Sequence, residues 1–449
     1  MATPSLLNFF LVNLTGQLIS RVCSFVINLY LLRNVDAALL GLVNVRLTLL
    51  YTSILFLVRE PLRKACLSVQ TNSATYVNHL WLAPVICFCF LLTLFTPLSS
   101  FCLAQVLSST AYLGVHLYHY YKLSLSTDFT SAPLGIVNFR GYFPSSHHGL
   151  DRTILKQIGS FLVHSVFKQL LTDGSAFVMT FTNTIGLANQ AVYDAIEKLG
   201  SLIARIVLAP LEESSYLYFS SQFERDVAIG DQPRLKVEEG VSTLKNLLRG
   251  TTLLSSVIIV FGIAYSQLAV GLYGGELLSS NQGGALLSCY LGYLFVMTIN
   301  GITECFATAT MSNTDIFAHI GFLFVCAFLY LGLNIGCSFY FAAFGFILAN
   351  ALNMAVRILY SWQHIQRYLR RWTPSFFELL PSVSTILLLV FSLFVTNLSN
   401  LIFGSTAGIV HNGAHIAIGG VMFLVVVLNI YKSELLLQQF VSRSIQHQD

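Results

Sequence analysis

The chain has 449 residues, of which 55% are hydrophobic and only 10% are charged, and its net charge is +4. Soluble globular domains carry about 25% charged residues, so this composition excludes a soluble protein of this length and predicts an all-α polytopic membrane protein. The alternating short segments of an outer-membrane barrel are absent. We interpret the small positive charge as a signal of membrane topology and not of nucleic-acid binding.

Apolar runs long enough to cross a bilayer, about 20 residues each, predict twelve transmembrane helices. They lie at 6–32, 37–58, 80–99, 101–121, 157–183, 185–221 (with a bend at Pro210), 250–273, 284–311, 316–333, 335–360, 377–398 and 408–431. We group these runs into a first helix bundle (1–122), a cytoplasmic connector (123–156), a second bundle (157–371), a C-terminal helix pair (372–431) and a tail (432–449). The mixed-charge segment 222–249 is predicted to be a solvated connector.

The basic residues predict the orientation. Eighteen of the 24 Lys and Arg residues fall in or beside alternate connections and the tail, and none lies between Thr251 and Val356. By the positive-inside rule these connections and both termini are cytoplasmic. The segment Met1–Pro4 has no basic residue and the run after it is too long for a signal peptide, so we expect the first helix to be retained.

Motifs for catalysis and metal binding are absent from the sequence. It has no CxxC pair, no His/Cys cluster with metal-ligand spacing and no GxxxxGK[ST] phosphate loop. His79, His116, His319 and His415 are isolated and are expected to be structural. Glu212 and Glu213 are neighbours, but adjacent helical residues point in different directions. We therefore expect no enzymatic activity, no cofactor and no metal.

Polar residues at helical spacing mark one face of several predicted helices. They are Asn13, Gln17, Arg21 and Asn28; His164, Lys168, Thr172, Ser175 and Asn183; Asp194, Glu197, Lys198, Ser201 and Arg205; and Asn350, Asn353 and Arg357. Such stripes either hold helices together or line an aqueous cavity. For the cations Arg21, Arg46, Lys168 and Arg205 we favour a cavity that accepts phosphate, because arginine matches phosphate geometry. The alternative is that Arg46 snorkels or pairs internally.

Several motifs resemble the Rft family, the eukaryotic members of the multidrug/oligosaccharidyl-lipid/polysaccharide exporter superfamily. They are VNVRLTLLY at 43–51, REPLRKAC at 59–66, VYD at 192–194, LGSLIAR at 199–205, PLEES at 210–214, YGG at 273–275, NGITECF at 300–306 and GFILAN at 345–350. The resemblance implies two helix bundles around a central cavity plus a final helix pair. It also implies an endoplasmic reticulum protein associated with moving dolichyl-diphosphate-linked oligosaccharide from the cytosolic to the lumenal leaflet for N-glycosylation.

The chain departs from the family pattern in two places. A segment resembling the family's sixth helix (101–105) comes almost directly after the third, so the first bundle lacks two helices. Ala176 stands where the family has a cavity arginine, so other cations would have to supply that charge.

We therefore expect a non-enzymatic, flippase-type glycolipid transporter without direct ATP coupling. Arg46, Arg59 and Arg63 would contact the diphosphate, with Arg21, Lys168 and Arg205 extending the positive face, while Glu304 and Arg357 would line or gate the second bundle. The alternative is a membrane scaffold for lipid-linked oligosaccharide assembly that moves nothing. A cation-coupled drug exporter is disfavoured, because the acids of the first bundle, Asp36 and Glu60, lie at helix ends.

Overall fold

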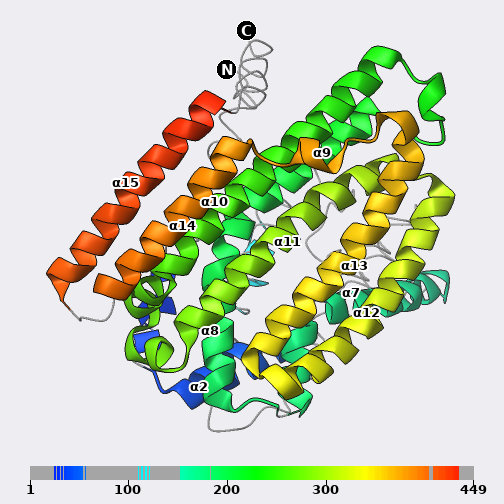
Figure 1. The fold of residues 1–449 in the computed structure, drawn as a ribbon. Helices are drawn as coiled ribbons and strands as arrows, with labels where there is room; N and C mark the ends of the chain where they lie inside the picture. Colours follow the sequence, from blue (N-terminus) through cyan, green and yellow to red (C-terminus); the bar gives the residue numbers. More distant parts are fainter. Residues whose placement is uncertain are drawn as a thin grey trace. The chain divides into compact units, whose positions relative to one another are not determined.

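The computed structural model describes residues 25–26, 28–30, 32–33, 35–53, 56, 110, 113–114, 117–118, 121, 152–182, 184–403 and 408–433. All regular structure in these ranges is helical (Figure 1). The chain divides into two compact units, Met1–Val45 with Val178–Asp449, and Arg46–Phe177. The larger unit holds most of the described helices.

Six helices of the larger unit are long and apolar enough to cross a membrane. They are α10 (Arg234–Ser280), α11 (Gly283–Thr310), α12 (Asn313–Phe341), α13 (Ala343–Leu369), α14 (Val383–Phe403) and α15 (Ile409–Ser433). They match the last six predicted runs, so a multi-pass membrane protein is confirmed, whereas the count of twelve is not. The first, third and fourth predicted runs lie largely outside the described residues.

The six helices pack in a continuous series. Helix α11 packs against α10 and α13, α12 against α13, and α14 against both α10 and α15, and Figure 1 shows α14 (orange) and α15 (red) alongside α10. Polar contacts fasten this C-terminal pair. Tyr265 of α10 donates to the carbonyl of His415 at 2.6 Å, and the ring of His415 lies 2.8 Å from the Ser399 hydroxyl. Polar side chains therefore join these helices, as expected in a membrane.

Helix α10 begins much earlier than its predicted run. The prediction of a solvated connector over 222–249 is wrong for its second half, because only the short segment between α9 (Ala209–Gln222) and Arg234 connects the helices. Val237, Val241 and Leu244 recur at helical spacing and are buried with Phe219 and Phe306 in one core cluster. An amphipathic first third of α10, with charges on its outer face, explains the mixed composition.

The break between α12 and α13 lies at Ala342, eight residues beyond the predicted boundary near position 334. Residues 331–341 contain no proline, so nothing ends the helix earlier. Just after the break, a Cβ added to Gly345 would lie 2.2 Å from the carbonyl oxygen of Cys337. Gly345 thus allows the two helices to turn back on each other at close range.

The sixth predicted run forms α8 (Leu187–Ile203), the π-helical segment η6 (Ala204–Leu208) and α9. The irregular turn directly precedes Pro210, which lacks a backbone N–H and disfavours regular helix before it. A second π-helical segment, η1 (Leu42–Leu47), comes after the short helix α2 (Ala37–Gly41) and contains Arg46. In the fifth run, α7 (Arg152–Thr182) departs from helical geometry at Asp173.

Candidate functional site

A partly buried ion pair joins α11 to α13 within the larger unit. Arg357 Nη2 donates to both carboxylate oxygens of Glu304, at 2.7 Å and 2.5 Å. Asn300, one turn earlier on α11, donates to the same carboxylate at 3.0 Å. The Arg357 and Glu304 side chains are only 20% and 19% exposed. The pair is therefore held by direct, charge-assisted hydrogen bonds.

The third helix at this site is α12, which contributes a buried histidine. His319 Nε2 lies 3.8 Å from Glu304 Oε1, and the histidine side chain is 7% exposed. Its ring centroid lies 5.4 Å from that of Tyr360, which stacks on Phe322. The aromatic rings thus pack beside the imidazole, whose Nε2 faces the carboxylate.

A second carboxylate reaches the site from α9. The Glu212 side chain lies against the backbone of α11 at Gly301, where an added Cβ would lie 1.9 Å from Glu212 Oε1. Cys305 of α11 donates to the Glu212 carbonyl at 3.3 Å, and Glu212 interacts electrostatically with both Glu304 and Arg357. Its neighbour Glu213 is exposed, as expected for adjacent helical residues.

These residues define the central charge cluster: Glu212, Asn300, Glu304, His319 and Arg357. It places two carboxylates, one guanidinium and one imidazole on four helices. Ion pairs of this kind are costly to bury and more costly to break, since removing one partner leaves the other charge uncompensated. Among the described residues, no group of three or more His, Cys, Asp or Glu side chains could hold a metal ion.

Arg205 is the remaining predicted site residue whose side chain the larger unit describes. It lies exposed in η6, and its guanidinium folds back along its own helix to Ser201 Oγ at 2.8 Å and the Lys198 carbonyl at 2.9 Å. Lys198 itself pairs with Asp194 at 2.8 Å, which is the favourable i, i+4 pair that the sequence indicated. The structure does not join Arg205 to the central charge cluster.

The other predicted cations belong to the remaining parts of the chain. Arg46 is half-buried in η1 and belongs to the smaller unit. Arg21, Arg59 and Arg63 lie outside the described residues, as does the side chain of Lys168, whose backbone is part of α7. A phosphate-binding role for these residues stays a prediction.

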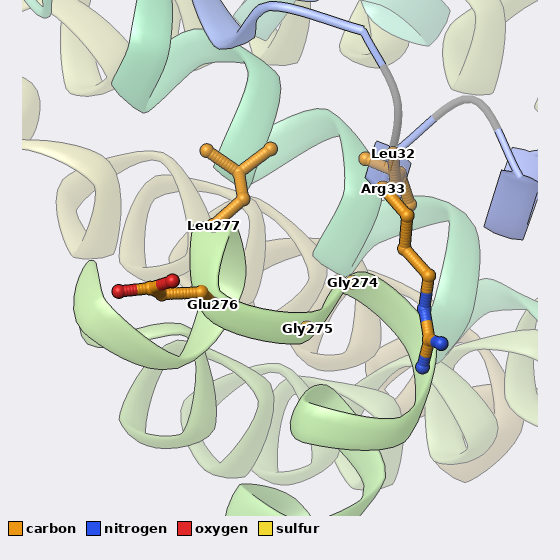
Figure 2. Close-up of a pocket in the computed structure, with 6 residues that line it drawn as sticks. All are labelled: Leu32, Arg33, Gly274, Gly275, Glu276 and Leu277. Atoms are coloured by element: carbon orange, nitrogen blue, oxygen red, sulfur yellow. The ribbon is translucent and has the colours of Figure 1, made fainter.

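Figure 2 shows a second feature of the larger unit, a pocket of about 300 Å³ beside a break in α10. Its lining consists of Leu32, Arg33, Gly274, Gly275, Glu276 and Leu277. Gly275 has φ +59°, a conformation that glycine adopts readily. Arg33 donates to the carbonyl of Leu272 at 2.6 Å. The arginine thus satisfies a carbonyl in the last turn before the break, and Gly275 allows the backbone to turn there.

Sequence reasoning identifies Glu304 and Arg357 but misses the other three members of the central charge cluster, Glu212, Asn300 and His319. Adjacent carboxylates diverge on a helix, which argues against a Glu212–Glu213 pair but leaves Glu212 free to face inward. His319 is isolated in the sequence because its partners lie 15 or more positions away. The available signal is an acid, a histidine and an arginine inside three consecutive apolar runs, since such residues in membrane helices face one another.

Comparison with known proteins shows to which family the chain is related. The family model described as Rft protein matches residues 7–99 and 95–443. The chain belongs to the Rft family. The two matched segments meet near residues 95–99, where the resemblance predicts the loss of two helices.

Relatives of this Rft-family chain have one name in common. Proteins named Man(5)GlcNAc(2)-PP-dolichol translocation protein RFT1 from Caenorhabditis elegans and Xenopus tropicalis are 36% and 32% identical to it, over 92% and 95% of the chain and 93% and 94% of their own lengths. The mouse protein of the same name is 32% identical over 79% of the chain and 80% of its own length. The first alignment spans 488 positions, more than the 449 residues here, so that relative has residues without a counterpart. No solved structure matches the chain.

Proposed function

We propose that this chain supports the translocation of dolichyl-diphosphate-linked oligosaccharide from the cytosolic to the lumenal leaflet of the endoplasmic reticulum, as a non-enzymatic membrane transporter. The observation that carries the proposal is membership of the Rft family, with relatives named for Man(5)GlcNAc(2)-PP-dolichol translocation aligned over nearly the whole chain. The six apolar helices with charge inside their bundle support it further.

The headgroup of such a lipid cannot cross hydrocarbon alone. Each hydroxyl or amide without a hydrogen-bond partner costs roughly 2–7 kcal/mol in an apolar medium, and a diphosphate costs more. A path lined by polar groups and cations removes this cost while the dolichyl chain stays in lipid. The cations proposed to meet the diphosphate are Arg21, Arg46, Arg59, Arg63, Lys168 and Arg205.

The roles of Glu304 and Arg357 are more specific than the sequence indicated. Because Arg357 already donates to both oxygens of Glu304, the pair is proposed to hold α11 and α13 together and not to bind phosphate. Breaking the ion pair would change the packing of the two helices. Of the two roles predicted from the sequence, lining or gating the second bundle, the pair is therefore proposed to have the gating role.

The energy source and orientation are inferred from the sequence alone. The chain has no phosphate loop for ATP, so movement is proposed to be passive, drawn forward by consumption of the product on the lumenal side. Both termini are proposed to be cytoplasmic.

Reconstitution of the purified full-length protein into liposomes tests the proposal. The liposomes carry Man(5)GlcNAc(2)-PP-dolichol with labelled mannose, and a membrane-impermeant lectin reports the fraction that reaches the outer leaflet. Proteoliposomes are expected to expose inner-leaflet label faster than protein-free liposomes and liposomes with an unrelated multi-pass protein. A rate equal to both controls contradicts transport.

A membrane scaffold is the second candidate function, and the closed Glu304–Arg357 pair favours it because such a pair also serves to hold helices together. Reversal of charge at Arg46 separates the two candidates. In cells depleted of the native protein, R46E is expected to be present at the normal level and to abolish N-glycosylation if the chain is a transporter. Full restoration of N-glycosylation by R46E supports the scaffold.

A further inference from the structure

The central charge cluster does not balance its charges. Glu212 and Glu304 are both acids, whereas Arg357 is the one permanent cation among the residues that act on Glu212 electrostatically. The Arg357 guanidinium is also shared unevenly between the two acids, since it donates to both carboxylate oxygens of Glu304. Glu304 has Asn300 and His319 as further neighbours. In the described part of the chain, the Glu212 carboxylate takes part in no hydrogen bond or ion pair.

The helices that pack against α9 supply Glu212 with little positive charge. Helix α11 presents Glu304 and Cys305, neither of which is a cation. On α10, Lys245 is paired with Glu378, and Arg249 is half-buried. In η6, Arg205 is bonded to its own helix. The described structure therefore offers Glu212 only the share of Arg357 that Glu304 leaves.

A carboxylate that is partly buried beside a second carboxylate has one common way to lose its excess charge, which is to bind a proton. Two such acids near one cation then behave as a coupled pair that holds a single exchangeable proton. The position of Glu212 against Gly301 fits this behaviour, because a neutral carboxyl group can pack against a helix at a glycine without a counterion.

We propose that the central charge cluster is a proton-binding site in which Glu212 carries the exchanged proton. Binding forms one O–H bond on the Glu212 carboxyl group with a proton from water, and no other bond changes. With the proton bound, Arg357 stays with Glu304. Without it, the charged Glu212 competes for Arg357, and this competition acts on α9 and α13, which both pack on α11.

This proposal concerns proton binding and does not depend on glycolipid movement, so each can fail without the other. Its test is infrared difference spectroscopy of the purified full-length protein in lipid, recorded as the pH is changed from about 5.5 to about 8.5. Wild type is expected to lose a carboxylic acid C=O band and gain a carboxylate band. The variant E212Q is expected to lack both changes, while E213Q, altered at the exposed neighbour, keeps them.

Further variants keep the test decisive if E212Q does not fold. The conservative variant E212D is expected to shift the titrating C=O band, because the two acids absorb at different frequencies, whereas H319Q is expected to retain the band. A titrating band that E212Q and E212D both leave unchanged overturns the proposal, as does the absence of any titrating C=O band from wild type. Loss of the band in H319Q with its retention in E212Q would place the proton on another carboxyl group, that of Glu304 beside His319, and overturn it equally.

Discussion

Arg357 and Glu304 are 53 positions apart in the sequence, yet one nitrogen of the Arg357 guanidinium donates to both oxygens of the Glu304 carboxylate. This contact joins two apolar helices through charge, at a place where each helix alone would expose an ion to a poor solvent. The pair makes the packing of α11 on α13 specific as well as stable.

Removing one partner of this pair is expected to be strongly destabilising. R357Q leaves the Glu304 charge without its counterion, and breaking a buried pair in this way costs about 3–5 kcal/mol. The thermal unfolding midpoint of the purified protein, measured by fluorescence-detected size exclusion, is expected to fall well below that of wild type. The double variant E304Q/R357Q should recover part of the loss, because no lone charge is left.

The matched control for that prediction is R234Q. Arg234 pairs with Glu238 on the outer face of α10, where the two side chains are 82% and 43% exposed. Pairs of this kind contribute less than about 1 kcal/mol. Equal losses in R357Q and R234Q would show that the inner pair contributes no more than a surface pair.

Gly301 is expected to tolerate no side chain while Glu212 is present. In G301A the new methyl group would occupy the space of Glu212 Oε1, which lies 1.9 Å from the ideal Cβ position. The Glu212 side chain must move, so the unfolding midpoint is expected to fall. The second-site change E212A should restore it, because it empties the same space.

Gly292 provides the comparison on the same helix, since nothing lies within 4 Å of an added Cβ there. The variant G292A is expected to equal or exceed the stability of wild type, because alanine favours helix over glycine by up to about 1 kcal/mol. If G301A behaves in the same way as G292A, Glu212 does not lie where the structure places it.

The Tyr265 hydroxyl is expected to help hold the C-terminal helix pair on α10. Y265F removes the 2.6 Å hydrogen bond to the His415 carbonyl but keeps the ring that stacks on His415 at 4.2 Å. A lost hydrogen bond of this type costs about 0.5–1.5 kcal/mol. A small fall in unfolding midpoint is therefore expected, with Y340F as the control because Tyr340 is 80% exposed. Equal unfolding midpoints for Y265F and Y340F would show that the Tyr265 hydroxyl does not help to hold the helix pair on α10.

Substitution of Gly275 is expected to destabilise the protein because of its backbone conformation. Nothing lies within 4 Å of an added Cβ, but φ is +59°, and residues with a side chain rarely adopt this region. G275A is expected to cost roughly 1–3 kcal/mol through strain alone. G271A in the same helix, where an added Cβ would make only an ordinary 3.6 Å contact, serves as control. If G275A is as stable as G271A, the break in α10 needs no glycine.

Much of the helical architecture could be predicted because apolar length alone determines a membrane span. The helices α10 to α15 all overlap their predicted runs. The start of α10 is missed by a search for apolar runs, because charged residues lie between Val237, Val241 and Leu244, although these three recur at helical spacing. The late end of α12 escapes prediction for a related reason, since no residue between 331 and 341 marks where the chain turns.

The central charge cluster was predictable only in part. Opposite charges at Glu304 and Arg357 inside two apolar runs indicate inward-facing residues, although not that the two side chains contact each other. The inclusion of Glu212 depends on the rotation of α9 about its axis, and Pro210 and the π-helical turn before it set this rotation. Sequence periodicity assumes a regular helix, so it cannot give the direction of a side chain beyond such an irregularity.

The wide turn at Ala204–Leu208 therefore fixes the angular phase of the downstream residues as far as Gln222. In a regular helix, one residue more or less rotates the downstream face by about 100°. Deleting a single residue from this turn would leave the composition and hydropathy of the segment almost unchanged. It would nevertheless swing Glu212 away from Gly301 and turn a different side chain toward α11. The number of residues in this turn thus determines which side chain faces α11 as much as the presence of an acid at position 212 does.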